Sequence, residues 1–209
     1  MSDWQSGGAL VDDLAQIALP NVFNPYSDHC TTHDLLNGSD IRRANLAAVL
    51  DAALAQGASD LWVGLELGAR GGRRTGLPLT DEIQLAACGD YWGVSTLARA
   101  TSGAPVKEQT ARYIWQAMAT APRRTFFWNA FPFHCHEAGC LTNRGHSRAE
   151  VALIPPVLPW LIKRLGVTRV VALGNDAQAA LGRAGIASHY VRHPGRGGGK
   201  LFLQTIHTV

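Results

Sequence analysis

Short apolar runs alternate with helical patterns through most of the chain, and this alternation is the strongest constraint on its fold. Strands are predicted over Leu61–Leu65, Thr125–Phe131, Thr168–Leu173 and His189–Arg192. Most of these runs are almost continuously apolar, which is typical of strands covered on both faces. The sequence therefore predicts an α/β fold: a three-layer αβα sandwich around a central four-stranded parallel sheet.

Helical patterns fall before and between these strands. They cover Gly8–Ile17, Ile41–Gln56, Lys107–Ala119, Ser147–Leu165 and Asp176–Ala184. The fourth begins with the capping-box pattern Ser147-Arg148-Ala149-Glu150, and its prolines are expected to kink it or split it in two. Residues 1–40 are otherwise predicted to be irregular, and Arg196–Gly199 is predicted to be a loop.

The length and composition bound the class of protein. The chain has 209 residues, 46% of them hydrophobic, so we expect one domain over 1–209 with its motifs within 60–200. The net charge is +3, and nearly all basic residues are arginine. Arginine suits an anionic partner, although a high-GC genome produces the same bias. Without a long apolar run or a signal-peptide pattern, we expect a cytoplasmic monomer that does not bind membranes.

Polar side chains follow the predicted strands. Glu66 follows the first strand, Asn129 lies in the second and His193 follows the last. Because ligands bind at the carboxyl ends of parallel strands, these three are expected to meet at one edge of the sheet. Each also has a structural interpretation: a solvent-facing carboxylate, a turn-forming amide and an imidazole bound to a backbone carbonyl. Their occurrence at successive strand ends favours a site.

At these residues the chain resembles the uracil-DNA glycosylase superfamily. The matching pieces are Gly64–Gly68, Asn129-Ala130 and His193-Pro194-Gly195, in the order in which that superfamily carries its motifs. The stretch Arg74-Thr75-Gly76 is similar to the iron–sulfur branch of the superfamily, and Asn143–Glu150 loosely resembles a polar segment of that branch. The resemblance covers roughly residues 60–200.

The resemblance implies a DNA-repair enzyme that flips uracil out of single- or double-stranded DNA and hydrolyses its N-glycosidic bond. The products are free uracil and an abasic site. By the same resemblance, Asn129 reads the N3 and O4 edge of uracil, His193 stabilises the departing anion, and Glu66 or Asp81 orients water. Base contacts are then expected from Leu65, Leu79 and Phe131, and phosphate contacts from Arg70, Arg73, Arg74, Arg192, Arg196 and Lys200.

Two features depart from the superfamily pattern. Leu79 stands where an aromatic side chain normally stacks on the base, so Phe131, Tyr91 or Trp92 would have to stack instead. The last motif is His-Pro-Gly rather than His-Pro-Ser.

The cysteines do not fit the iron–sulfur branch, which has two close cysteines near its N-terminus. Cys30 has no close partner. Cys135 and Cys140 lie beside His134 and His136, but no second Cys/His pair completes a usual zinc pattern. We therefore expect reduced thiols and a reaction that needs neither a metal nor a cofactor.

Three other functions remain open at this point. The protein could be a glycosylase for another deaminated base, such as hypoxanthine or xanthine, or a DNA-binding module without chemistry. It could also be a phosphate-binding protein that uses Gly68–Gly76, although no Gly-Lys-Ser/Thr pattern supports a P-loop there.

Overall fold

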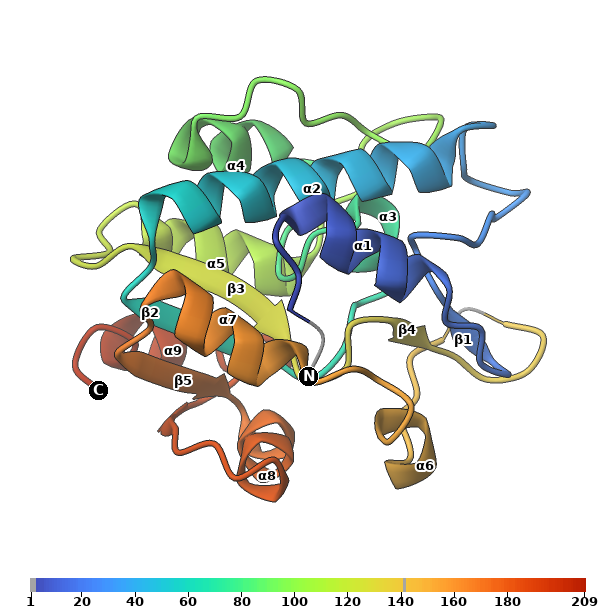
Figure 1. Cartoon of the computed structure of the whole chain (residues 1–209). Helices are drawn as coiled ribbons and strands as arrows, with labels where there is room; N and C mark the ends of the chain where they lie inside the picture. The colour runs from blue at the N-terminus through green and yellow to red at the C-terminus, as the bar shows by residue number, and fades with distance from the viewer. Residues whose placement is uncertain (1–2, 141) are drawn as a thin grey trace.

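The computed structural model describes residues 3–140 and 142–209, and a four-stranded parallel sheet forms its centre (Figure 1). The strand order is β3–β2–β5–β6. The bounds are β2 Asp60–Gly64, β3 Thr125–Asn129, β5 Arg169–Leu173 and β6 His189–Val191. Every residue of β2 and β3 is buried, because helices cover both faces of the sheet. The predicted fold class is confirmed.

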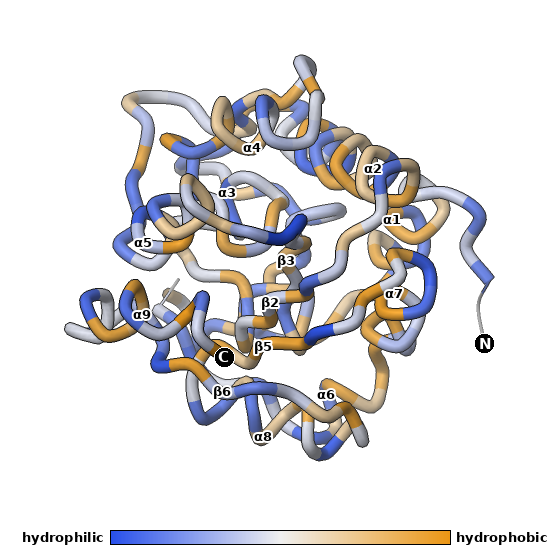
Figure 2. The backbone as a smooth tube through the Cα atoms, turned by 90° about the vertical axis from the view of Figure 1, so that its left-hand side faces the viewer, coloured by the Kyte–Doolittle hydropathy of each residue, from blue (hydrophilic) through white to orange (hydrophobic). Residues whose placement is uncertain are grey.

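Helices cover both faces of this sheet. Their bounds are α1 Gly7–Ala15, α2 Gly38–Gln56, α3 Gly72–Thr75, α4 Leu85–Trp92, α5 Gln109–Met118, α6 Arg148–Val151, α7 Val157–Leu165, α8 Asn175–Arg183 and α9 Gly199–Thr205. Figure 2 shows α2 and α7 on one side of the apolar strands and α5 and α9 on the other. α8 packs against β5 and β6. No helix within the described residues is long and apolar enough to cross a bilayer.

The long helix predicted over Ser147–Leu165 is split in two. α6 ends at Val151, α7 begins at Val157, and Pro155 and Pro156 lie between them. Ser147 accepts a hydrogen bond from the backbone N–H of Glu150, whose side chain accepts one from the backbone of Ser147. Both the capping box and the proline break are therefore confirmed.

The helix predicted over Gly8–Ile17 is confirmed as α1, and most of the segment between α1 and α2 is irregular as predicted, apart from the short strand β1 (Val22–Phe23). α1 packs along α2, and β1 pairs in antiparallel fashion with β4 (His134–Cys135). The buried Tyr26 hydroxyl donates to the backbone oxygen of Gly76 at 3.0 Å. These contacts join residues far apart in the sequence, so no local pattern could reveal them.

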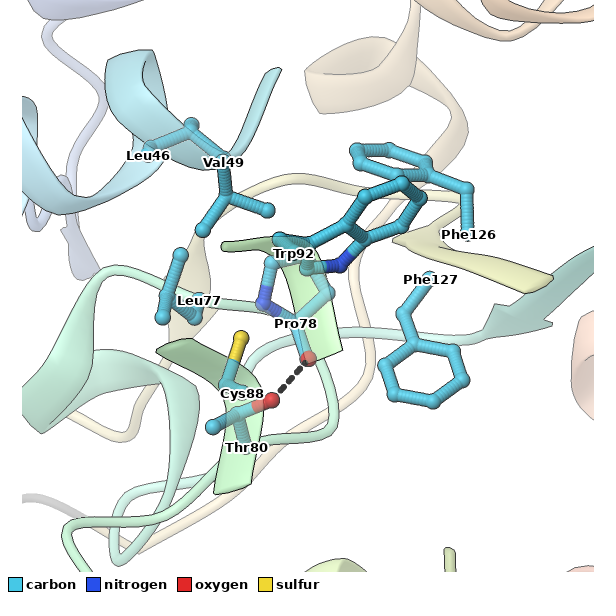
Figure 3. A pocket seen from close by; sticks show the side chains of 9 residues that line it. All are labelled: Leu46, Val49, Leu77, Pro78, Thr80, Cys88, Trp92, Phe126 and Phe127. Carbon is cyan, nitrogen blue, oxygen red and sulfur yellow. Dashed lines mark hydrogen bonds between the residues drawn. The ribbon is translucent and has the colours of Figure 1, made fainter. Parts of the chain in front are cut away.

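The segment that follows the Gly-rich loop packs into the hydrophobic core. Leu77, Pro78 and Thr80 line a cavity of about 10 Å³ beneath α2 and α4 (Figure 3). Such a space is near the lower limit for one water molecule and excludes a base. Trp92 lines this cavity, and the Tyr91 hydroxyl accepts a hydrogen bond from the backbone N–H of Thr125. The proposal that either ring stacks on a base is therefore wrong.

Candidate active site

A cleft of about 1100 Å³ opens at the carboxyl edge of the sheet. Glu66 lines it after β2, Gly174 after β5 and His193 after β6. The strand order places β3 and β5 on opposite sides of β2, and crevices of parallel sheets form at such reversals. The structure thus brings Glu66 and His193 to the predicted edge.

His193 is held as a neutral hydrogen-bond donor. Burial and the positive charges of Arg192 and Arg196 hold the pKa of His193 below its ordinary value, against the opposing effect of Asp176. Its Nδ1 accepts a hydrogen bond from the backbone N–H of Gly195 at 3.0 Å. The proton of the neutral ring therefore lies on Nε2, which can donate to an oxygen in the cleft.

Asn129 ends β3 immediately behind the cleft wall. Its side chain is 1% exposed, and neither amide atom has a hydrogen-bond partner within the described chain. A Cβ on Gly64 would lie 2.4 Å from the Asn129 Oδ1 and 3.2 Å from the Leu79 Cδ2. Gly64 and Leu79 both line the cleft, so they separate the amide from it. Leaving both atoms of a buried amide without partners is energetically costly.

The three predicted apolar base contacts differ in position. Leu65 and Leu79 line the cleft, and Leu79 has a positive φ of 54° that leucine rarely adopts. Phe131 is fully buried, and its ring stacks on the His146 ring at a centroid distance of 5.1 Å. Because His146 occupies that face, the prediction that Phe131 contacts the base is wrong for this structure.

The rim of the cleft is basic. Arg70, Arg192 and Arg196 are exposed and line the cleft, at the place where phosphate contacts were predicted. Further basic side chains that the sequence did not single out also line it: Lys107, Arg112 and Arg144. Lys200 is exposed in the first turn of α9 but does not line the cleft.

The prediction that Arg73 and Arg74 hold phosphates is wrong. Arg73 is 1% exposed, and its guanidinium lies over the Phe23 ring at 4.3 Å. Arg74 is 6% exposed and pairs with Glu82 at 3.0 Å, while also donating to Thr101 at 2.9 Å. Arg73, Arg74 and Thr75 lie in α3, Gly76 caps its end, and both arginine side chains are buried in the protein rather than exposed to solvent.

Three further carboxylates line the cleft: Asp81, Glu108 and the exposed Asp176. The Asp81 side chain accepts hydrogen bonds from the backbone N–H groups of Ile83, Gln84 and Glu108. Burial raises the pKa of Asp81 above its usual value, although these three donors act against it. Asp81 is therefore held as a structural anchor for the start of α5, with its oxygens already engaged.

Glu108 is a cleft residue that the sequence did not indicate. Its carboxylate lies against the backbone of the motif loop, where a Cβ on Gly68 would come within 2.4 Å of its Oε1. Burial raises the pKa of Glu108 to about 7, the negative charge of Asp81 adds to this, and Arg70 opposes it. No local pattern marks Glu108, since Asp81 brings it to the cleft through a contact across 27 positions.

Glu108 is expected to make stability fall as pH rises. Its folded-state pKa of about 7 exceeds the ordinary 4.5, so between these values the folded protein retains a proton that the unfolded chain releases. We therefore compare the Glu108→Gln variant with the wild type at each pH. The free energy of unfolding of the variant, relative to that of the wild type, should be higher at pH 8 than at pH 5 by on the order of 2 kcal/mol. Urea unfolding at both pH values tests this, with the exposed Glu137→Gln as control. An equal effect at both pH values would contradict it.

The cysteines and the histidines beside them do not form a metal-binding cluster among the described residues. All four cysteines are free; Cys135 is buried and Cys140 is exposed. Burial raises the pKa of Cys135 to about 12, which disfavours the thiolate that binds metals. Among the described residues, no three His, Cys, Asp or Glu side chains are grouped so that they could hold a metal ion.

Comparison with known proteins gives no identification. No family model matches the chain, and no curated protein matches it significantly. The functional assignment therefore depends on the cleft and on the residues that form it.

Proposed function

We propose that this chain is a uracil-DNA glycosylase that flips uracil into the cleft and hydrolyses its N-glycosidic bond. The observation that carries the proposal is the presence of a buried, unpartnered amide and a neutral imidazole donor at the carboxyl edge of the same sheet. Asn129 ends β3, and His193 follows β6. Such a pair suits a planar base that carries both donors and acceptors.

The chemistry follows from these two groups. As the C1′–N1 bond breaks, negative charge develops on the uracil, and the Nε2–H of His193 would stabilise it at O2. Asn129 would bind the N3 and O4 edge once Leu79 moves aside. Cytosine reverses the donor and acceptor pattern at positions 3 and 4, so the amide would face a mismatched edge and lose its hydrogen bonds.

The basic rim supports a DNA substrate. Arg70, Arg192 and Arg196 surround the opening and would bind phosphates on either side of a flipped nucleotide. Flipping costs a few kcal/mol and is cheaper in single strands or at mismatches. Uracil opposite guanine and single-stranded uracil are thus expected to be released faster than uracil opposite adenine.

The test is base release from labelled oligonucleotides that hold one uracil, in single strands or paired with guanine or adenine. Alkali then cleaves at abasic sites, and EDTA is present to test the expectation that the reaction needs no metal. We expect cleavage at uracil and none at cytosine in the same sequence. Release of hypoxanthine or xanthine instead would assign another base, while salt-dependent DNA binding without release of any base would overturn the proposal.

A further inference from the structure

Glu66, which lines the cleft, forms a tight pair with His146, the residue that follows the cleft-lining Gly145. The Glu66 Oε1 accepts hydrogen bonds from the His146 backbone N–H at 2.5 Å and from its Nδ1 at 2.6 Å. The two side chains are 11% and 6% exposed. A buried histidine and carboxylate joined in this way resemble the base-and-orienter arrangement of hydrolytic sites in geometry.

Two further contacts fix the His146 ring. It stacks on Phe131 with an interplanar angle of 22°. The loop that carries it is anchored by Arg144, which donates to the backbone oxygen of His136 at 3.0 Å and to the Glu150 carboxylate at 2.6 Å. Hydrogen bonds from Arg144 hold the pKa of Glu150 down at about 2, so this anchor stays charged.

The pairing determines which nitrogen of His146 carries the proton. A carboxylate only accepts hydrogen bonds, so Nδ1 is the donor, and the neutral ring keeps a lone pair on Nε2. No hydrogen bond to this Nε2 occurs within the described residues. His146 is therefore a potential proton acceptor, whereas His193 has the opposite tautomer and is a donor.

We propose that His146, positioned by Glu66, is the general base that activates water for glycosidic hydrolysis. This deepens the proposed function and rests on it. The water O–H bond breaks and its proton goes to Nε2 of His146, while the water oxygen bonds to C1′. The C1′–N1 bond breaks, and its electron pair leaves with the uracil anion. The imidazolium then returns its proton, through solvent, to the released anion.

Two other carboxylates of the cleft, Asp81 and Glu108, fit this role less well. Asp81 is engaged by three backbone N–H groups. Glu108 is the strongest competitor, because a carboxylate with a pKa of about 7 can accept a proton near neutral pH, but its Oε1 lies against the backbone of Gly68. The Glu66 Oε1 is already bound to both the backbone N–H and the Nδ1 of His146. Its negative charge instead stabilises the imidazolium that forms during the reaction.

The test compares single-turnover uracil release by four variants. His146→Asn keeps a donor in the place of Nδ1 but removes Nε2, and we expect kcat to fall about a hundredfold with DNA affinity unchanged. Glu66→Gln keeps the acceptor and removes the charge, with an expected loss of about tenfold. The double variant should be no slower than His146→Asn, since the pair acts as one unit. His136→Asn, a change in the same loop, is the matched control and should retain full activity.

Two measurements separate a chemical role from a structural one. Added imidazole should restore part of the activity of His146→Ala. Nitrogen NMR of histidine-labelled protein should place the proton on Nδ1 of His146 and on Nε2 of His193. The opposite tautomer at His146 would overturn the inference without any activity assay.

The outcomes distinguish this inference from the proposed function. Uracil release by the wild type together with full activity of His146→Asn would overturn the inference alone. A loss confined to Glu108→Gln would do the same and assign the base to Glu108. Absence of base release by the wild-type protein would overturn the proposed function, and the inference with it.

Discussion

Replacing His193→Ala is expected to slow uracil release by about a hundredfold or more, which corresponds to roughly 2.7 kcal/mol of transition-state stabilisation. The effect is large because the neutral ring donates from Nε2 to an oxygen that gains charge as the bond breaks. Gly195 fixes that tautomer through Nδ1, and Gly174 packs against the His193 Cβ, so the donor is aimed before substrate arrives. Single-turnover kinetics at saturating enzyme measure this loss directly.

The matched control for this variant is His189→Ala. His189 begins β6 and is exposed, so its loss should change neither base release nor unfolding. DNA affinity of His193→Ala should remain close to that of the wild type, because the side chain acts mainly on the departing base. If uracil release by His193→Ala equals that of the wild type, His193 takes no part in the reaction.

The architecture could be predicted from the sequence because it depends on patterns within short stretches of the chain. Nearly continuous apolar runs indicate strands buried on both faces, and Pro155 and Pro156 break a helix by their own geometry. The same reasoning placed Glu66 and His193 at one sheet edge, since parallel strands end together. These predictions required no knowledge of contacts between distant residues.

What escaped prediction depends on contacts across long stretches of sequence. His146 lies 80 positions from Glu66, so nothing in its spacing indicates the pair. Phe131 was expected to contact the base, yet the fold places the His146 ring on its face. A Gly- and Arg-rich stretch also looks the same in sequence whether its charges face water or the interior. That choice follows from Glu82 and Thr101, which lie outside the stretch.

The largest expected effect on stability comes from replacing a buried arginine, Arg74, rather than an exposed one at the rim of the cleft. Replacing Arg74→Ala should lower the free energy of unfolding by about 2–3 kcal/mol, because the buried Glu82 would lose one of its two arginine partners and keep only Arg99 at 3.3 Å. Burial acts to raise the pKa of Glu82, but hydrogen bonds from Thr101, Val106 and Arg74 outweigh it and keep that pKa below its usual value. Urea unfolding measures the loss, which is a large fraction of the total stability of a domain.

The matched variant for Arg74→Ala is Arg196→Ala, which removes the same side chain from the rim of the cleft. It should change the free energy of unfolding by about 0.5 kcal/mol or less. It should instead weaken binding to DNA of any sequence and reduce the salt slope of that binding by about one unit, because one phosphate contact is lost. Arg74→Ala, at temperatures where it stays folded, should keep the wild-type slope. A reduced slope in Arg74→Ala with undiminished stability would show that Arg74 reaches phosphate, as its sequence context alone suggested.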